Sequence, residues 1–361
     1  MPIGYAIPVA LLAFCTATAI VAPRPPHTTP SHWSFWVTLQ INELPFVGIY
    51  ILVAISALAF AQGDLDSPGG LEVLGFAVLT VVGLAVLIER ALRTPAAFGL
   101  TFGRRPWAHI LLAPTVKRRR DVALVRNIPY GDAGKHNLLD VYHRRDRRGG
   151  GPVLVFFHGG GFRMGSKNRE ARAMLNQLAA RGWVCVNANY RLAPASFPDH
   201  HVDGKKVVAW VRSHIGEYGG DPRTIIASGS SAGGHMAAML ALTPNDPAFQ
   251  PGFEGENTAI DAAIGFGGYY GRIAGPGSSP LDHIGEAPPF LVVHGANDSL
   301  TLVEDARDFA GRLRAASSQP VRYVELPGGQ HGFDLYYSLR YSYVIEAVAA
   351  FGESVRQPPS S

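Results

Sequence analysis

The sequence contains a serine framed by glycines, Gly229-Ser230-Ser231-Ala232-Gly233. A β-branched run over 224–228 precedes this motif, and a helical pattern begins at Ala232. A tight turn from a strand into a helix strains the backbone of its central residue and requires small residues two places away. Such a turn would hold the Ser231 hydroxyl at a helix N-terminus, where negative charge is stabilised. The motif predicts a nucleophilic Ser231; the alternative is a glycine-rich turn that only packs a helix on a sheet.

A second glycine motif, His158-Gly159-Gly160-Gly161, follows the apolar run 153–157. Glycines allow bare backbone N–H groups to approach a ligand closely, and such donors stabilise the oxyanion of a tetrahedral intermediate. The rival interpretation is a phosphate-binding loop, but neither a G-x-x-x-x-G-K-[ST] pattern nor a Rossmann acidic residue in register is present. We therefore predict an oxyanion-hole loop and interpret His158 as a structural, hydrogen-bonded histidine.

A serine nucleophile needs an imidazole to accept its proton and a carboxylate to orient that imidazole. Asp298 follows the apolar run 290–294, at the carboxyl end of a predicted strand, where sheet enzymes place their chemistry. His331 lies in a glycine-flanked loop after the last predicted strand. The chain order Ser231, Asp298, His331 is that of the α/β-hydrolase arrangement. We predict these three residues as a catalytic triad.

Other acidic residues and histidines have simpler interpretations. Glu304 and Asp305 fall in a helical pattern and are expected to face solvent. His200 and His201 are expected in a polar loop, and His235 in a helix just behind the nucleophile.

The elements that must position these residues begin near residue 121. Short β-branched runs alternate there with longer amphipathic stretches, which is typical of a mostly parallel sheet flanked by helices. The predicted strands are 123–128, 138–142, 153–158, 184–189, 224–228, 262–266, 290–294 and 322–326, and the predicted helices are 169–181, 202–215, 232–242, 302–316 and 341–354.

Residues of about 121–355 resemble the α/β-hydrolase fold and, within it, the hormone-sensitive-lipase-like carboxylesterases. The resemblance rests on His158-Gly159-Gly160-Gly161-Phe162, Tyr190-Arg191-Leu192-Ala193-Pro194, Gly220-Asp221-Pro222, Ser231-Ala232-Gly233-Gly234, Asp298 and His331-Gly332-Phe333. It implies that the N–H groups of Gly160, Gly161 and Ala232 form the oxyanion hole. The chain departs from the pattern at Ser230 and Ala195, where acidic residues are common, and it lacks the family's N-terminal cap helices.

The first 95 residues have a different composition from the rest. They hold three basic and five acidic residues, against 29 and 23 in the remainder, and include three runs without charge at 3–22, 44–61 and 73–88. A bilayer core of about 30 Å needs roughly 20 apolar residues in a helix. We predict three transmembrane helices, at about 3–22, 42–61 and 71–92; the alternative is three buried core helices.

The charges near these runs predict an orientation. The link 62–70 is acidic, whereas Arg90, Arg93, Arg104, Arg105 and the run 117–120 follow the third apolar run. Basic residues near the ends of spans stay cytoplasmic. We therefore expect the N-terminus outside, a membrane anchor over 1–95, a basic juxtamembrane linker over 96–120, a cytoplasmic hydrolase domain over 121–355 and a polar tail over 356–361.

Together these features predict a membrane-anchored serine carboxylesterase or lipase-type hydrolase acting on hydrophobic acyl esters. The alternatives are amide, formamide or acetyl-carbohydrate cleavage on the same fold, and a membrane scaffold without activity. The expected partners are an ester substrate and membrane lipids, with no nucleic acid, cofactor or metal. Two cysteines exclude a disulfide framework and a four-cysteine zinc site, and 47% hydrophobic residues exclude a disordered chain.

Overall fold

A computed structural model describes residues 2–21, 29–114, 119–146 and 149–356. Arg24, Lys117 and Arg118 and most of the predicted polar tail lie outside these residues. The chain divides into two compact units. The first comprises residues 1–115, 295–302 and 325–343, and the second comprises 116–294, 303–324 and 344–361.

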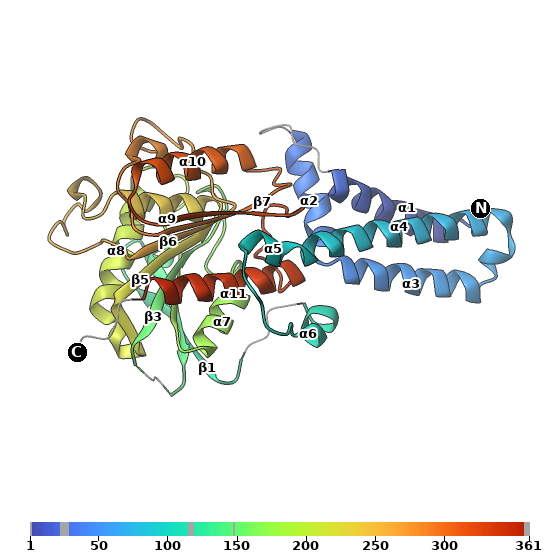
Figure 1. Ribbon diagram of the computed structural model, residues 1–361, viewed down its shortest axis with the longest axis horizontal. Coiled ribbons are helices and arrows are strands. Elements are labelled where there is room, and N and C mark those ends of the chain that lie inside the picture. The colour runs from blue at the N-terminus through green and yellow to red at the C-terminus, as the bar shows by residue number, and fades with distance from the viewer. Residues whose placement is uncertain (1, 22–28, 115–118, 147–148, 357–361) are drawn as a thin grey trace. The chain divides into compact units, whose positions relative to one another are not determined.

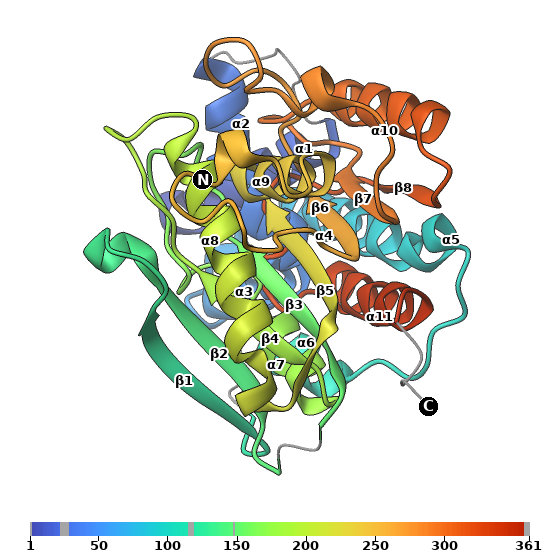
Figure 2. The ribbon, with the colours of Figure 1, turned by 90° about the vertical axis from the view of Figure 1, so that its left-hand side faces the viewer.

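The structure confirms the predicted mostly parallel sheet of eight strands, in the order β1-β2-β4-β3-β5-β6-β7-β8. The strands are β1 Val122–Pro129, β2 Leu138–Arg144, β3 Gly151–Phe157, β4 Val184–Ala188, β5 Gly220–Ser230, β6 Ala262–Phe266, β7 Phe290–Gly295 and β8 Val321–Leu326. The pairs β1–β2 and β2–β4 are antiparallel, whereas β4, β3, β5, β6 and β7 pair in parallel. Figure 2 shows β1 and β2 at one edge of the sheet and β7 and β8 at the other.

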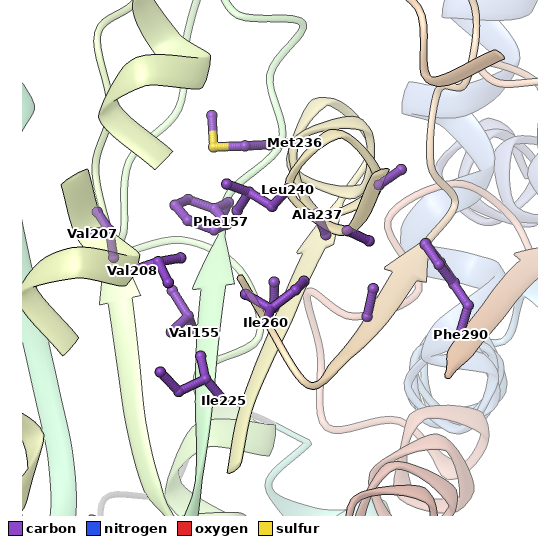
Figure 3. Packing of buried hydrophobic residues seen from close by; sticks show 14 of the residues in the cluster. Val155, Phe157, Val207, Val208, Ile225, Met236, Ala237, Leu240, Ile260 and Phe290 are labelled. Carbon is purple, nitrogen blue, oxygen red and sulfur yellow. The ribbon is translucent and has the colours of Figure 1, made fainter. Parts of the chain in front are cut away.

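The central strands are apolar without alternation because both of their faces are buried. All seven residues of β3 and all six of β7 are buried. Val155 and Phe157 of β3 share a core cluster with Met236 and Leu240 of the following helix, as Figure 3 shows. This packing sets the helix that follows Ser231 firmly on the sheet.

Five helices of eight or more residues accompany the strands. They are α7 Arg172–Ala180, α8 Asp199–His214, α9 Ala232–Leu242, α10 Val303–Ala316 and α11 Leu339–Ser354. Helices α8, α9 and α10 contribute to the core cluster of Figure 3, whereas α7 packs on β1, β2 and β4. The predicted helices are all present, with ends that differ by a few residues.

The first unit contains a bundle of three long apolar helices, α1 Ile3–Val21, α3 Pro45–Ala61 and α4 Pro68–Leu92, which lie side by side in Figure 1. Buried contacts hold the bundle together: the Tyr5 hydroxyl and Ser56 Oγ lie 2.9 Å apart, and the bare backbone of Gly83 faces Thr16. The outward faces carry exposed large apolar side chains, including those of Phe60 and Leu79.

The second apolar run differs in detail from its prediction. A separate helix, α2 Thr29–Glu43, precedes α3 and makes an angle of 82° with it at the break beside Leu44. The break follows from Pro45, because a residue before proline disfavours the helical conformation, and Leu44 has φ −124° and ψ 48°. The apolar helix therefore begins at Pro45, and Glu43 belongs to α2.

Within the described residues, two helices, Ile3–Val21 and Pro68–Phe98, are long and apolar enough to cross a membrane, and there are three if the bent pair of α2 and α3 counts as one span. The shorter elements are α5 Thr94–Phe98, α6 Trp107–Leu112 and the 3₁₀ turns Asp64–Asp66, Gly134–Asn137, Ile215–Tyr218, Pro247–Phe249 and Pro280–His283.

One arginine of the predicted basic linker is packed rather than solvated. The Arg105 guanidinium lies 5.7 Å from the ring centre of Phe102 and 4.8 Å from that of Tyr343. It also donates to the carbonyl oxygens of Gly103 and Ser342. Arg105 therefore packs within the first unit as well as contributing a positive charge to the linker.

Candidate active site

Ser231 lies alone between β5, which ends at Ser230, and α9, which begins at Ala232. Its φ of 54° and ψ of −114° are strained for a residue with a side chain. The backbone is held by hydrogen bonds on both sides: Ser231 N donates to Phe266 O at 2.9 Å, and Tyr269 N donates to Ser231 O at 3.2 Å. The structure thus has the strand–turn–helix geometry expected around a nucleophilic serine.

The flanking glycines are required by close backbone contacts. A Cβ on Gly229 would lie 2.3 Å from the carbonyl of Gly233, and a Cβ on Gly233 would lie 1.9 Å from Phe157 O. No side chain fits at such distances. The small residues of the motif therefore allow the turn to close against β3.

The glycine loop after β3 passes directly beside Ser231. A Cβ on Gly159 would lie 3.1 Å from Ser231 Cβ. Gly160 has φ 117° and Gly161 has φ 60°, both in the region that favours glycine. Among the residues that the structure describes, the N–H groups of Gly160 and Gly161 have no hydrogen-bond acceptor, and that of Ala232 begins a helix and so has no partner within it. These donors are available to a ligand.

Glu170 and Tyr190, neither of which was predicted as a site residue, brace this loop. Gly159 N donates to Glu170 Oε2 at 2.5 Å, and the Tyr190 hydroxyl donates to His158 O at 2.7 Å. Tyr190 belongs to the Tyr-Arg-Leu-Ala-Pro motif, so its motif was a usable signal. Glu170 lies outside every motif, and only its spatial position identifies it.

Asp298 and His331 form a hydrogen-bonded pair in the first unit. His331 Nδ1 donates to Asp298 Oδ2 at 2.7 Å, since a carboxylate can only accept. The backbone N–H groups of Leu300 and Thr301 donate to Asp298 Oδ1, and the Thr301 hydroxyl donates to Oδ2. With Nδ1 as the donor, Nε2 of the neutral imidazole is an acceptor, which is the form that a general base requires.

The predicted site residues therefore fall into two groups. Ser231, Ala232 and the two loop glycines lie in the second unit, and Asp298 and His331 lie in the first. Their catalytic roles stay predictions.

The structure confirms the simpler interpretations of His158, Glu304 and Asp305. His158 is buried with its Nδ1 2.7 Å from Gly159 O, and burial lowers its pKa to about 4. Glu304 and Asp305 are exposed on α10.

The prediction for His200 and His201 is wrong. Both lie buried in the first turn of α8, rather than in a polar loop. His200 stacks on Phe162 with ring centres 4.2 Å apart. Aromatic neighbours that are distant in the sequence cover these rings, so their polar residue type misled the prediction. His235 lies on α9, as expected.

Among the residues that the structure describes, no three His, Cys, Asp or Glu side chains are grouped so that they could hold a metal ion.

The chain is similar to several known proteins. The BD-FAE family model matches residues 139–269. The chain is 44% identical over 264 residues to the probable carboxylic ester hydrolase LipM of Mycobacterium tuberculosis, covering 64% of this chain and 61% of LipM. It is 38% identical over 272 residues to the esterase LipC of the same organism, covering 66% of this chain and 67% of LipC.

A solved structure of esterase 2 from Thermogutta terrifontis, described as butyrate-bound, superposes with a TM-score of 0.57 at 26% identity. The match covers 67% of this chain and 97% of that one. The fold and these relatives define an α/β-hydrolase. The chain belongs to the family of α/β-hydrolase esterases that includes mycobacterial LipC, and it spans about three fifths of the length of LipM.

Proposed function

We propose that the protein is a serine carboxylesterase or lipase-type hydrolase with Ser231, Asp298 and His331 as its catalytic triad. The observation that carries this proposal is the strained backbone of Ser231 in a glycine-framed turn. The hydrogen bond between His331 and Asp298 supports it, because it leaves Nε2 of His331 to accept a proton. Membership of an esterase family gives independent support.

The reaction follows from these roles. His331 removes the Ser231 proton as Oγ attacks the ester carbonyl, and the N–H groups of Gly160, Gly161 and Ala232 stabilise the resulting oxyanion. His331 then protonates the leaving alcohol, which leaves an acyl-serine. Water, deprotonated by His331, attacks this acyl group and releases the acid and Ser231. Asp298 holds the imidazole in one tautomer throughout.

Hydrophobic acyl esters are the proposed substrate class, as in the hormone-sensitive-lipase-like carboxylesterases that the motifs resemble. Bound butyrate in the Thermogutta terrifontis structure is consistent with carboxylic acyl groups.

The test compares wild-type protein with Ser231→Ala on p-nitrophenyl esters of graded acyl length. We expect kcat to fall by about 10⁴- to 10⁶-fold in the variant, as for loss of a triad nucleophile. Ser213→Ala is the matched control, because this exposed serine bonds only within α8. A Ser231→Ala protein as active as the control would refute the assignment.

We further propose that α1, α3 and α4 anchor the protein in a membrane, with the hydrolase region on the cytoplasmic side. Exposed apolar side chains along these helices support insertion, since a water-exposed bundle would face polar residues outward. The acidic link 62–70 and the basic residues after α4 support the orientation.

Cysteine labelling in intact cells tests this topology. In a Cys15→Ser background, a membrane-impermeant maleimide should label Gln62→Cys and leave Gly255→Cys unlabelled until the cells are opened. Both positions are exposed, and Gly255 has free space for a side chain. Labelling at 255 but not 62 would reverse the orientation, and release of the protein by alkaline carbonate would contradict the anchor.

A further inference from the structure

Helix α2 has one buried face, and it lies on the loops that carry Asp298 and His331. Most of the buried residues are spaced as one side of a helix requires; they are Ser34, Phe35, Thr38, Leu39, Ile41 and Asn42, and Glu43 is buried at the end of the helix. Trp33 and Trp36 of the same helix are exposed. All of these contacts lie within the first unit.

The Gln330 side chain connects the two catalytic loops. Its Oε1 accepts the backbone N–H of Ser299 at 2.8 Å and that of His331 at 2.8 Å. Ser299 follows Asp298 directly, so one amide group ties the loop of the acid to the loop of the base. Because both donors are backbone N–H groups, Oε1 must face them and Nε2 must point the other way.

The amide nitrogen of Gln330 forms a hydrogen bond with Thr38 of α2. Gln330 Nε2 donates to Thr38 Oγ1 at 3.1 Å, while Thr38 Oγ1 itself donates to Ser34 O at 2.7 Å. The hydroxyl hydrogen is thus committed to the helix, and the oxygen is left to accept. Thr38 and Gln330 are only 1% and 2% exposed, so solvent cannot replace this bond.

Two further contacts hold α2 in this position. The Phe35 ring meets the His331 imidazole edge to face, with centres 5.8 Å apart and an interplanar angle of 71°. At the other end of the helix, Glu43 accepts from Arg340 Nη1 at 2.6 Å and from the Ser338 hydroxyl at 2.7 Å. The helix is therefore anchored on both sides of Thr38.

We propose that Thr38 is a positioning residue of the hydrolase, which acts through Gln330 to hold Asp298 and His331 in register. Helix α2, which precedes the hydrolase region by about 80 residues, is then part of the catalytic apparatus. This inference rests on the proposed function, because the register of the pair matters only if His331 serves Ser231. Catalytic groups must keep their geometry within about 0.5 Å, and a bond from a rigid helix supplies that constraint.

The experiment compares Thr38→Val, Thr38→Ser and Thr80→Val in the full chain, purified in detergent. Valine matches threonine in shape but cannot accept a hydrogen bond, whereas serine keeps the hydroxyl. Thr80 is a matched control, because it is buried in α4 and donates to the carbonyl four residues earlier, as Thr38 does, but bonds to no catalytic loop.

We expect Thr38→Val to lower kcat by about 10- to 100-fold with KM unchanged, as for a small misplacement of catalytic groups. Thr38→Ser should retain most of the activity, and Thr80→Val should match wild type. The rate of Ser231 labelling by a fluorophosphonate, which depends on the same base, should fall in parallel with kcat.

Equal kcat values for Thr38→Val and Thr80→Val would overturn the inference. If Thr38→Val does not fold, Thr38→Cys replaces it: its weakly accepting sulfur should give an intermediate kcat, and a wild-type kcat would overturn the inference. Failure of the proposed function is distinguishable, because it would show as an inactive wild type or an active Ser231→Ala.

Discussion

Ser231 shows how a single residue's conformation depends on its neighbours. A positive φ at a serine is unfavourable in isolation, and it persists here because β5, β6 and α9 constrain the backbone on both sides. The glycines at 229 and 233 make this possible by letting the chain approach β3 without a clash. The motif is therefore a steric requirement as well as a sequence pattern.

Substituting one of these glycines tests that requirement at the residue scale. We expect Gly233→Ala to lower the free energy of unfolding by about 3 kcal/mol, because its Cβ would lie 1.9 Å from Phe157 O and the strand must move. Thermal unfolding in detergent, followed by tryptophan fluorescence, measures the change. Gly255→Ala, with open space around it, should behave as wild type; an equally stable Gly233→Ala would show that the turn relaxes freely.

At the scale of elements, α2 was the helix that the sequence did not predict. Its buried face mixes the apolar Phe35, Leu39 and Ile41 with the polar Ser34, Thr38, Asn42 and Glu43, so polar residues interrupt its apolar stripe. Its partners lie nearly 300 residues further along the chain. No local pattern could have revealed that these polar groups would be satisfied by the loops around His331 and Arg340.

The buried ion pair between Glu43 and Arg340 gives a prediction for this element. Both side chains are at most 1% exposed. Removing one charge leaves the other buried without compensation, and we expect Glu43→Gln to destabilise the protein by about 3 kcal/mol. Glu304→Gln is the control, since its pair with Arg307 is exposed and contributes about 1 kcal/mol or less. Similar unfolding temperatures for the two variants would contradict this.

For the whole molecule, the buried histidines of the hydrolase region predict a loss of stability in acid. Burial lowers the pKa of His158 and of His200 to about 4 and that of His235 to about 3, from an ordinary 6.5. As the pH falls below 6.5, these histidines become protonated in the unfolded chain but stay neutral in the folded protein. Their contribution to stability is therefore fully present above pH 6.5 and is lost as the pH falls toward 4.

We expect the free energy of unfolding to fall by about 1.4 kcal/mol per pH unit for each of these histidines between pH 6.5 and pH 4.5. The unfolding temperature should therefore fall steeply over this range. His235→Asn should make this dependence shallower, because it removes a group that titrates only in the unfolded state. His214→Asn, at an exposed position, should leave the slope unchanged. Identical slopes in all three proteins would show that other groups govern acid unfolding.

The sequence by itself determined the order of strands and helices, the fold class and the glycine-framed turn, because these depend on local periodicity and on short-range steric limits. It also indicated the apolar N-terminal helices, since hydrophobic length is a local property. Only the tertiary structure decided that Glu170 braces the glycine loop, that His200 is buried, and that α2 packs on the loop of His331. Those contacts join residues far apart in sequence, and a polar side chain becomes a core residue only when a distant partner satisfies its hydrogen bonds.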